Sequence, residues 1–559
     1  MFIPTTKEEL IALGWNSLDI ILVSGDTYID SYFDGIALIG KLLLSKGYKV
    51  GIIAQPETTG SQCIMRLGEP NLFWGVSAGC VDSMVANYTA LLKKRRTDDL
   101  TPGALNNRRP DRATLIYTNL IQRFSTKKRP IILGGIEASL RRIAHYDYWS
   151  DKIRRSILLD SKADALVYGM GEKTIIELAQ KTKNAVDWTD TKGICYLSNE
   201  KPRNAIELPS FEQVQKDKDS FIKMFNLFYK TNKIQSEEQL FQQHSNRFLI
   251  HNPPQSPPSQ DELDSYYELD FERDVHPFYK KQGKVKALET IKFSICSHRG
   301  CFGECNFCSI AIHQGNKIIN RSKESIINEA KKLSNKPDFK GNISDLGGPS
   351  ANMFGMNCKS TKKNFKCEKN CISPNVCKNL NNSHFELINL LKELRQLQKI
   401  KNIFIGSGIR FELVFSDKQN GIKYLSDIIE HHVSGQMKIA PEHISRQVLK
   451  AMGKESEYSV LDFKNEFYKI NKKIGKKQFL TYYFIAAHPA CYEADMIQLR
   501  NFIKKDLKIN PEQVQIFTPT PSSYSTLMYY TEKSHLTNEN IFVEKSLKKK
   551  REQKEMITK

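Results

Sequence analysis

The feature that most constrains this chain is a short loop of three cysteines, Cys301, Cys305 and Cys308, spaced x3 and then x2. Phe307 precedes the last cysteine, and a strand-like run from Glu289 to Ile295 precedes the loop. Three thiolates at this spacing can bind three irons of a cubane and leave the fourth iron without a protein ligand. We therefore expect an iron-sulfur cluster with one reactive iron at this loop.

Two simpler interpretations use the same region. Cys296 and His298 lie just upstream, so four of these five groups could close a tetrahedral zinc site. Two of the cysteines could also pair as a disulfide. The cluster is favoured because C-x3-C-x-aromatic-C is a much more restricted pattern than a single C-x2-C pair.

Four other runs accompany the loop and narrow its interpretation. They are GGIEASLRR at 134–142, HRGCFG at 298–303, DLGGPSANM at 345–353 and KIAPEH at 438–443. Together with C-x3-C-x2-C after a strand, they resemble the YgiQ family of radical S-adenosylmethionine (radical SAM) proteins. Because the runs extend from residue 134 to residue 443, the resemblance covers most of the chain.

The resemblance implies a 4Fe-4S cluster on Cys301, Cys305 and Cys308, with SAM bound to its open iron. An electron passed through the cluster would split the sulfonium into methionine and a 5′-deoxyadenosyl radical, which takes hydrogen from a substrate. A low-potential reductant such as flavodoxin or ferredoxin would supply the electron. The resemblance does not identify the substrate.

The first two hundred residues alternate between apolar strand-like runs and helical patterns. We expect strands near 18–24, 48–54, 72–76, 130–133 and 163–168, and helices over 35–46, 81–93, 137–143 and 172–181. Continuous apolar strands are typical of a parallel sheet buried on both faces. The pattern predicts an α/β domain with a doubly wound parallel sheet, similar to a Rossmann or cobalamin-binding domain.

A ligand of such a sheet should lie at the carboxyl ends of its strands, here Gly25–Thr27, Gly134–Gly135 and Gly169–Glu172. Some radical SAM enzymes bind cobalamin in a domain of this shape through D-x-H-x-x-G. The corresponding run Asp30–Gly35 has Tyr32 in place of the histidine, which argues against a histidine-ligated cobalamin. The alternative is a domain that only shapes the entrance for substrate.

Composition shifts divide the chain into four parts. We expect the α/β domain over 1–205, and a helical and proline-rich linker over 206–284 that contains a charged, helix-prone stretch at 211–249. A radical SAM core over 285–535 would carry a cysteine-rich insertion at about 356–380, and 536–559 would form a basic tail. A chain of 559 residues is too long for one core.

The second half repeats strand and helix signals. Strands are expected at 342–346, 402–405, 436–440, 481–486 and 513–517, and helices at 322–333, 387–398 and 421–431, with Ser322 as a candidate helix cap. Repeated βα units predict a full or partial TIM-type barrel, with its active groups at the carboxyl ends of the strands.

Polar residues follow several of these strands, and the resemblance assigns them to SAM. The candidates are Asp345, Gly347, Gly348, Ser407, Arg410, Glu412, Glu442 and His443. Gly347 and Gly348 correspond to the superfamily's G-G-E-like strand end, with Pro349 in place of the glutamate. Arg410 could bind a carboxylate bidentately. A salt bridge or turn contact is the alternative for each polar residue.

Two histidines are candidate catalytic residues on the substrate side. His145 lies in the aromatic and polar run 144–149, and His488 follows the strand expected at 481–486. For His145, a contact between domains is the alternative.

A second group of cysteines, Cys358, Cys367, Cys371 and Cys377, lies in a loop rich in Lys and Asn. Four cysteines with little apolar sequence between them could fold around a metal, either a structural zinc or an auxiliary Fe-S cluster. Zinc is favoured because four ligands close its shell. Four thiols without metal are the alternative.

The net charge and the cysteine content indicate which partners and which cellular compartment to expect. A net charge of +21 favours a polyanion such as RNA, although scattered lysine pairs would give the same total. Seven of the twelve cysteines fall between Cys301 and Cys377, which indicates metal in a reducing compartment. The absence of a long apolar run or signal peptide predicts a cytoplasmic protein without membrane contact.

These features leave three classes of function. The first is a radical SAM enzyme, in a narrower version an RNA methyltransferase or methylthiotransferase. The second is a non-catalytic Fe-S protein for electron transfer or sensing. The third is a zinc-only binding module.

Overall fold

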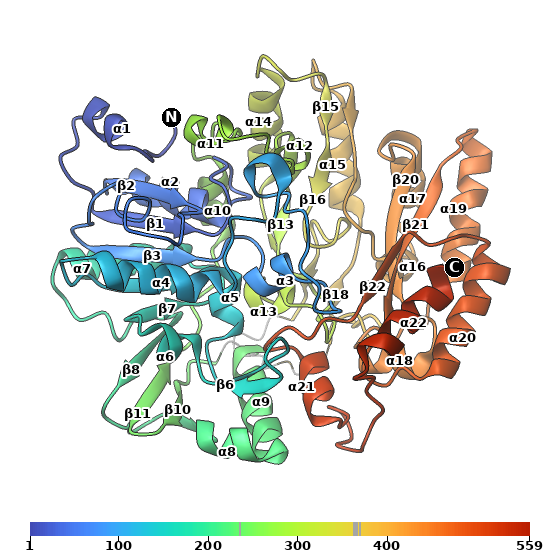
Figure 1. Cartoon of the computed structure of the whole chain (residues 1–559). Coiled ribbons are helices and arrows are strands. Elements are labelled where there is room, and N and C mark those ends of the chain that lie inside the picture. Colours follow the sequence, from blue (N-terminus) through green and yellow to red (C-terminus); the bar gives the residue numbers. More distant parts are fainter. Residues whose placement is uncertain (234–235, 361–366, 368–369, 559) are drawn as a thin grey trace. The chain divides into compact units, whose positions relative to one another are not determined.

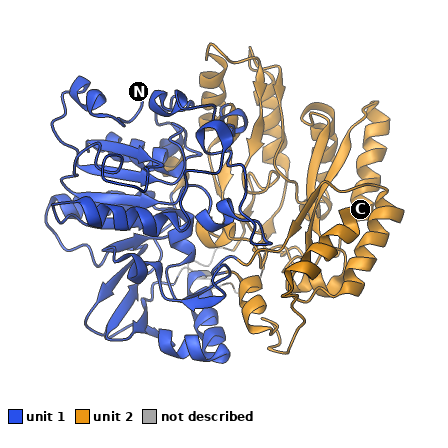
Figure 2. Ribbon diagram, viewed as in Figure 1, with its two compact units in different colours: residues 1–258, 265–292, 520–522 blue, residues 259–264, 293–519, 523–559 orange. Residues whose placement is uncertain are grey.

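The computed structural model describes residues 1–233, 236–360, 367 and 370–558. Two compact units make up this part of the chain (Figure 2). Unit 1 comprises residues 1–258, 265–292 and 520–522, and unit 2 comprises 259–264, 293–519 and 523–559.

A nine-stranded sheet forms the centre of unit 1, in the order β2-β1-β3-β4-β7-β8-β11-β10-β9 (Figure 1). The strands β2, β1, β3, β4 and β7 are parallel, as expected, and β8 and β11 continue the sheet with antiparallel pairing. The bounds are β1 (Ile20–Ser24), β2 (Val50–Ala54), β3 (Phe73–Ser77), β4 (Ile131–Gly134), β7 (Ala165–Val167), β8 (Ile194–Ser198), β9 (Ile206–Leu208), β10 (Leu240–His244) and β11 (Arg247–His251).

Helices on the sheet account for the helical patterns of the first half. α2 packs on β1, β2 and α7, whereas α4 packs on β3 and α6. Alternate residues of the strands, such as Ile20 and Leu22, enter one core with apolar residues of α2 and α7. The bounds are α1 (Lys7–Ala12), α2 (Gly35–Ser45), α3 (Ser83–Asn87), α4 (Ala113–Phe124), α5 (Gly135–Leu140), α6 (Ile157–Ser161) and α7 (Glu172–Lys183).

Three expectations for the first 295 residues were wrong. The helix expected over 81–93 is only the short α3, capped by Asp82 and followed by extended backbone at Tyr88. The stretch 211–249 contains α8 (Phe211–Lys216) and α9 (Lys218–Lys233), but its end forms β10 and β11 of the large sheet. The strand expected over 289–295 begins only at Ser294, because α12 (Ala287–Ile291) precedes it.

The segment expected as a linker, 206–284, is therefore largely part of unit 1. It supplies β9, β10 and β11 to the sheet, followed by α10 (Gln260–Tyr267) and α11 (Pro277–Lys280). Unit 1 also contains the hairpin of β5 (His145–Asp147) and β6 (Lys152–Arg154). Pairing with the sheet satisfies backbone groups that a free linker would leave to water.

Unit 2 is built from parallel strands in chain order. β12 (Ser294–Cys296) pairs with β16 (Asp345–Gly347), and β15 (Asn342–Ile343) pairs with β19 (Asn402–Ile403). Residues 404–405 and Ile409 continue the hydrogen-bonded order toward β20 (Gln436–Glu442). β20 pairs with β21 (Phe479–Ala486), and β21 pairs with β22 (Gln513–Ile516). This order gives the expected partial barrel.

Helices separate the barrel strands as predicted. They are α14 (Lys323–Ser334), α15 (Phe385–Arg395), α16 (Phe411–Ser416), α17 (Gly421–His431), α18 (Arg446–Ala451), α19 (Val460–Ile474), α20 (Glu493–Phe502) and α21 (Tyr524–Thr531). Ser322 caps α14 by accepting from Ser325 N at 3.1 Å, which confirms the predicted cap. Short elements near the cysteines are β13 (His298–Arg299), α13 (Ile310–Gln314), β14 (Ile319–Asn320), β17 (Asn357–Cys358) and β18 (Leu380–Asn381).

The C-terminal segment is more than a basic tail. α22 (Leu547–Thr558) packs against α20, β21 and β22, with Lys550, Gln553 and Ile557 buried. Lys550 Nζ donates to Tyr529 Oη at 2.8 Å, and Gln553 Oε1 accepts from Ala487 N at 3.0 Å. Among the helices of the described residues, none combines the length and apolar character that a membrane span requires.

Candidate functional site

A cavity of about 160 Å³ in unit 2 has all three cysteines of the loop in its wall. The opposite walls come from the ends of β16 and β20 and from the segment after β19, as expected for a parallel barrel. Besides Cys301, Cys305 and Cys308, the lining residues are Glu304, Phe307, Ile310, Ala311, Pro349, Ser350, Gly408, Ile409, Arg410, Glu412, Ala440, Glu442 and Lys454. The cysteine loop and the strand ends thus share one space.

The cysteine loop leaves β13 through Gly300, which has a φ of 83°. A Cβ at this position would lie 1.9 Å from the carbonyl oxygen of Lys317, so only glycine fits. Within the loop, Cys308 N donates to Cys305 O at 2.9 Å. Glu304 has a φ of 41°, which is uncommon for a residue with a side chain. The loop is therefore tightly turned beside its second cysteine.

Asn306 fixes the loop to the rest of unit 2. Its backbone N donates to Met452 O at 2.9 Å, and its Nδ2 donates to Ala451 O at 2.8 Å. Its carbonyl oxygen accepts from Ser525 N at 2.9 Å, and Nδ2 lies 3.1 Å from His535 Nε2. One residue between Cys305 and Cys308 thus anchors the loop to the end of α18 and to α21.

The three thiols are close enough to influence one another. Burial raises the pKa of Cys308 to about 12, and the neighbouring Cys305 and Cys301 add to the rise. Among the described residues, no three His, Cys, Asp or Glu side chains surround one point as a single ion would require. A cubane makes a different demand, because each cysteine binds its own iron. Three cysteines on one loop supply the three thiolates that such a cluster requires.

The zinc alternative with Cys296 and His298 does not match this geometry. His298 is buried with Nδ1 2.9 Å from Ser297 Oγ, and its ring fills the space beside Gly348. Cys296 Sγ donates to the carbonyl oxygen of His298 at 3.2 Å. Both residues lie outside the lining of the cavity, so they do not join the three cysteines there.

Arg410 and Glu412, both predicted from the sequence, line the cavity. Arg410 Nη2 donates to Cys305 Sγ at 2.8 Å, and Arg410 Nη1 lies 3.5 Å from Glu412 Oε1. Burial acts to lower the pKa of Arg410, but Cys305, Glu412 and Cys301 outweigh it and hold that pKa above its ordinary value. The guanidinium is therefore a fixed positive charge beside Cys305.

Asp345 and Ser407, also predicted, contact each other. The Asp345 carboxylate accepts from Gly406 N at 2.8 Å, from Ser407 N at 3.2 Å and from the Ser407 hydroxyl. Neither Asp345 nor Ser407 lines the cavity. Asp345 here joins β16 to the segment after β19, and a SAM contact for either residue stays a prediction.

Gly347 and Gly348 lie just behind the cavity wall. The Gly347 carbonyl accepts from Ser297 N at 2.7 Å, and a Cβ at Gly348 would lie 2.5 Å from the His298 ring. The next two residues, Pro349 and Ser350, line the cavity instead. The glycines allow close packing at the strand end, and their contact with SAM stays a prediction.

Glu442 sits at a bulge of β20 with a φ of 64° and lines the cavity. Lys454 Nζ donates to Glu442 Oε1 at 3.2 Å and to the Ala440 carbonyl. Burial raises the pKa of Glu442, and the charge of Lys454 opposes that rise. A buried ion pair thus forms one wall.

His443 follows Glu442 but points away from the cavity lining. Its Nδ1 accepts from Ser445 N at 3.0 Å, and its Nε2 lies 3.8 Å from Cys491 Sγ. Burial lowers the pKa of His443 to about 4. Its predicted contact with SAM is untested.

His488 is also bonded on both ring nitrogens. Nδ1 lies 2.8 Å from Pro489 O and Nε2 lies 2.7 Å from Ser525 Oγ, and burial lowers the pKa of His488 to about 3. The ring packs edge-on against Phe307 of the cysteine loop at 6.3 Å. These contacts describe a neutral residue that supports the loop, and its catalytic role stays a prediction.

His145 lies in β5 of unit 1 and is buried. Its Nδ1 lies 3.0 Å from Ile143 O, and burial lowers the pKa of His145 to about 3, helped by the charge of Arg141. It borders a space of about 10 Å³ that Arg112, Arg141 and Arg154 also line. Whether His145 contacts substrate stays a prediction.

The second group of cysteines lies in the hairpin closed by β17 and β18. Cys358 is opposite Leu380, and Cys377 N donates to Cys371 O at 2.9 Å. Burial raises the pKa of Cys371 to about 12, with smaller contributions from Glu304 and the other three cysteines of the group. Cys371 and Cys377 also pack on an apolar cluster around Phe302. The four thiols are thus neighbours, next to the first cysteine loop.

One of the strand ends of unit 1 where a ligand was expected, Gly25–Thr27, is covered by the chain itself. Thr27 N donates to Leu100 O at 3.0 Å, and Arg109 Nη2 lies 2.6 Å from the buried carboxylate of Asp26. Residues near 98–109 therefore cover Gly25–Thr27 at the end of β1.

Tyr32, the residue in place of a cobalt-binding histidine, is buried in an aromatic cluster. Its ring lies 4.3 Å from that of Tyr267 and 5.9 Å from that of Phe271, and the Arg273 guanidinium lies 4.2 Å from its centre. This packing occupies the position that the D-x-H-x-x-G pattern would give to a metal ligand.

Sequence reasoning missed several residues of the site. Lys454 was missed because it follows α18 without any motif, and only the bulge of β20 brings it to Glu442. Asn306 lies inside the cysteine loop, between Cys305 and Cys308. Its side chain can both donate and accept hydrogen bonds, and this property could have marked it as an anchor of the loop. Asn352 was inside the quoted run 345–353, but its partners are distant in sequence.

Known protein families and solved structures resemble this chain in sequence and in fold. The model of the family described as Radical SAM N-terminal matches residues 2–294. A radical SAM methyltransferase, TsrM from Kitasatospora setae, solved with cobalamin and a 4Fe-4S cluster bound, has a similar fold with a TM-score of 0.52. It is 14% identical, and the match covers 90% of this chain and 74% of that one.

Curated relatives match the whole chain. A UPF0313 protein of Fusobacterium nucleatum subsp. nucleatum is 54% identical over 100% of this chain and 98% of its own length. UPF0313 proteins of Thermotoga petrophila and Methanocella arvoryzae are each 47% identical, over 100% and 98% of this chain and 98% and 91% of their own lengths. The chain therefore belongs to the YgiQ family of radical SAM proteins, UPF0313.

Proposed function

We propose that this member of the radical SAM superfamily holds a 4Fe-4S cluster on Cys301, Cys305 and Cys308 and uses it to cleave SAM reductively. The observation that carries the proposal is the cavity that these three thiols share with the strand ends of the barrel. The superfamily accounts for the chemistry, and the cavity supplies a place for SAM next to the cluster. The substrate is not identified.

When bound, the cluster and SAM supply the electron transfer and the 5′-deoxyadenosyl radical that takes hydrogen from substrate. The chain's own residues position these groups and exclude water. Asn306 anchors the loop, and Gly300 allows its close turn against Lys317. The thiols are partly buried, and the exclusion of water around them strengthens electrostatic contacts there.

The charged residues of the cavity suit the polar groups of SAM. Arg410 and Lys454 offer positive charge to a carboxylate, and Glu304, Glu412 and Glu442 offer acceptors to an amine or to ribose hydroxyls. Backbone groups at Gly408, Ile409 and Ala440 line the same space. The cavity therefore combines both kinds of partner that an amino acid with a nucleoside needs.

Release of 5′-deoxyadenosine tests the proposal. The anaerobically reconstituted and reduced protein, incubated with SAM, should release 5′-deoxyadenosine and methionine, detected by liquid chromatography and mass spectrometry. Substituting each of Cys301, Cys305 and Cys308 by alanine should abolish the product. Cys63→Ala in unit 1 is the matched control and should keep it. Product that survives loss of a loop cysteine would disprove the assignment, and absence of product from a cluster-bearing protein would favour an electron carrier or sensor.

We also propose that the hairpin between β17 and β18 binds a metal through Cys358, Cys367, Cys371 and Cys377. The four thiols lie in one loop and three of them influence the pKa of Cys371, which supports this, and a four-thiolate set suits zinc or an Fe-S cluster. Metal analysis of anaerobically purified protein separates the two: about four irons with one zinc supports zinc, and about eight irons supports a second cluster. Cys371→Ala should remove only this second metal.

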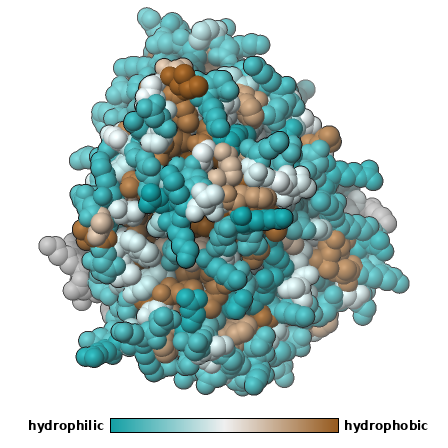
Figure 3. All heavy atoms as spheres, turned by 60° about the vertical axis from the view of Figure 1, so that its left-hand side comes forward, coloured by the Kyte–Doolittle hydropathy of each residue, from teal (hydrophilic) through white to brown (hydrophobic). Residues whose placement is uncertain are grey.

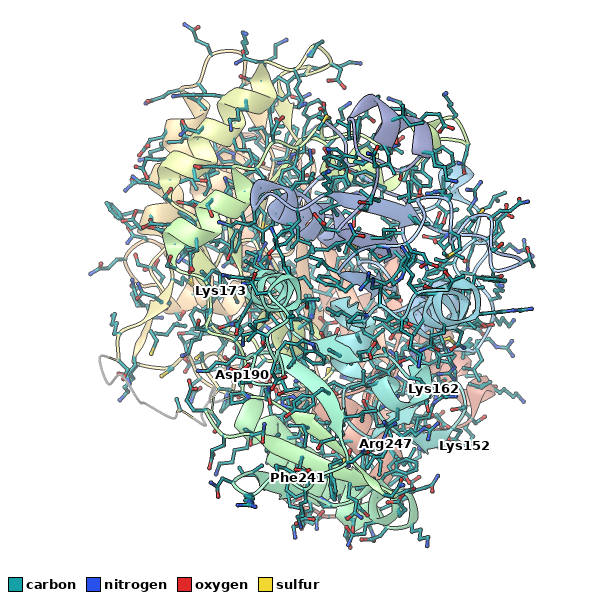
Figure 4. The ribbon with its side chains drawn as sticks, turned by 90° about the vertical axis from the view of Figure 1, so that its left-hand side faces the viewer. Lys152, Lys162, Lys173, Asp190, Phe241 and Arg247 are labelled. Carbon is teal, nitrogen blue, oxygen red and sulfur yellow. The ribbon has the colours of Figure 1, made fainter. Side chains whose placement is uncertain are left out.

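An RNA substrate is a narrower version of the function, favoured by the net charge of +21. Lys152, Lys162 and Arg247 are exposed on one side of unit 1 (Figure 4), and the face shown in Figure 3 is mostly hydrophilic. Binding of tRNA should then be tight at low salt and fall steeply as salt rises. Weak binding at low salt would remove RNA from consideration.

A further inference from the structure

Arg410 does more than line the cavity, because its guanidinium makes a directed hydrogen bond to Cys305. The guanidinium is buried, and its Nη2 lies 2.8 Å from the Cys305 sulfur. Gly303 makes room for this contact, because a Cβ there would lie 2.1 Å from Nη2 and 2.8 Å from the guanidinium carbon. A side chain at position 303 would therefore collide with the Arg410 guanidinium in its present position.

Asn352 holds the backbone of Arg410 from both sides. Its Oδ1 accepts from Arg410 N at 2.9 Å, and its Nδ2 donates to Arg410 O at 2.9 Å. This pair of bonds fixes Arg410, at the start of α16, to the segment that follows β16. The asparagine amide is oriented by these bonds, because only this orientation matches one donor and one acceptor.

His384 and Asp417 continue the network behind Asn352. His384 Nε2 lies 3.2 Å from Asn352 Nδ2, and its Nδ1 lies 3.0 Å from Asp417 Oδ2. Asp417 Oδ2 also accepts from His384 N at 2.8 Å, and the ring stacks on Tyr424 at 4.6 Å. Nδ1 therefore carries the proton, and Nε2 accepts from the asparagine. Asp417, His384 and Asn352 form a continuous buried chain that ends at Arg410.

Glu412 completes the surroundings of the guanidinium at 3.5 Å. It balances part of the positive charge but does not replace the bond to sulfur. A charge-assisted N–H donor directed at a thiolate is a strong hydrogen bond. Hydrogen bonds to cluster sulfurs are among the factors that set the reduction potential of Fe-S centres.

We propose that Arg410 is a positioning residue that raises the reduction potential of the cluster by donating to Cys305, and that Asn352, His384 and Asp417 hold it there. This inference rests on the proposed cluster. Reduction adds negative charge to the cluster and its sulfurs, so a fixed positive donor stabilises the reduced form. Removing the donor therefore shifts the potential to more negative values.

A redox titration followed by electron paramagnetic resonance (EPR) tests the inference on the reconstituted full-length protein. Arg410→Gln removes the charge and should give a midpoint potential more negative than that of the wild type. Arg410→Lys keeps the charge without the fork of donors and should fall between the two. Arg395→Gln is the control, because Arg395 pairs with Asp427 and His432 in the same unit and should leave the potential unchanged.

Two further variants act on the contact without removing the arginine. Gly303→Ala should displace the guanidinium from Cys305, and Asn352→Ala should release its backbone, so both should shift the potential in the same direction as Arg410→Gln. Iron content is measured for every variant. If Arg410→Gln does not assemble a cluster, Gly303→Ala and Arg410→Lys decide the result.

The outcomes separate this inference from the proposed function. A wild-type protein without a cluster would overturn both. A cluster whose potential is the same in the wild type, Arg410→Gln and Gly303→Ala would overturn the role of Arg410 and leave the proposed function intact. A negative shift in both variants, with Arg395→Gln unchanged, supports the inference.

Discussion

At the scale of single residues, the cavity depends on charges that are paired away from water. Glu442 and Lys454 have side chains only 10% and 6% exposed, and each is the other's partner. Removing one member of a buried pair leaves an uncompensated charge, which costs about 3–5 kcal/mol in typical cases. The pair therefore supports the wall of the site as well as its chemistry.

Lys454→Met should destabilise the protein at neutral pH by an amount of that order. The measurement is the free energy of unfolding of unit 2 in urea, compared with the wild type. The double variant Glu442→Gln with Lys454→Met should recover much of the loss, because no charge is then left buried. A single variant as stable as the wild type would contradict the buried pair.

The same variant should show a defined dependence on pH. Burial raises the pKa of Glu442 from its ordinary value of 4.5, and loss of Lys454 raises it further. An acid whose folded pKa is raised loses stability as the pH increases from the unfolded pKa through the folded one. The deficit of Lys454→Met should therefore be smallest near pH 4.5 and grow toward neutral pH. A deficit independent of pH would contradict this assignment.

Local sequence was sufficient for some site residues and insufficient for others. The cysteine spacing is a property of one loop, and Arg410, Glu412 and Glu442 lie within a few residues after predicted strands, so their place at the cavity could be predicted. Asn352, His384 and Asp417 meet only after the segments that follow β16 and β19 fold together. Nothing in their own neighbourhoods indicates that contact.

At the scale of elements, one residue of the cysteine loop, Asn306, connects it to several neighbouring segments. Asn306 contacts three separate segments through its backbone and amide groups. Its loss would leave Ala451 O without this donor, at a cost of about 1–3 kcal/mol for a buried group.

Asn306→Ala should therefore lower the iron bound per chain after reconstitution, although every cysteine is kept. Asn342→Ala is the matched control, since Asn342 is exposed and its side-chain oxygen accepts from Asn402 Nδ2 at 2.8 Å. Iron and sulfide analysis of both variants checks the expectation. Equal iron content in the two variants would show that Asn306 is not needed to hold the loop.

Most elements could be predicted, and the failures share a physical cause. Continuous apolar strands and 3.6-residue periodicity identified the parallel strands and α2, α7, α14 and α17 within a few residues. β10 and β11 were missed because their mixed sequence is stabilised as strands by tertiary pairing, of β11 with β8 and of β10 with β11. α3 ends at Asn87, whose side-chain amide donates to the Arg109 carbonyl and to Asp111, and extended backbone follows at Tyr88.

At the scale of the whole molecule, segments distant in sequence complete each unit. Residues 206–251 complete the sheet of unit 1, and α22 covers β21 and β22 in unit 2. Composition alone suggested a linker and a basic tail for these segments. Their charged residues are numerous and their buried residues are few, so the composition does not indicate that the segments pack against a core. Lys550, Gln553 and Ile557 are the buried residues of α22.

Deleting residues 547–559 should consequently destabilise unit 2, a result not expected for a dispensable tail. Lys548→Ala with Lys549→Ala is the control, because both lysines are exposed and the substitution lowers the charge without disturbing the packing. Thermal unfolding of the two proteins should show a lower midpoint only for the deletion. Equal midpoints would show that α22 contributes nothing to the fold.

The most direct test of the central claim is the EPR spectrum of the reduced, anaerobically reconstituted protein before and after addition of SAM. Three cysteine ligands leave one iron open, so SAM should bind it and change the spectrum of a 4Fe-4S cluster. Cys305→Ala should remove the signal. A reconstituted protein without a cubane, or a cubane whose spectrum is the same with and without SAM, would contradict the account.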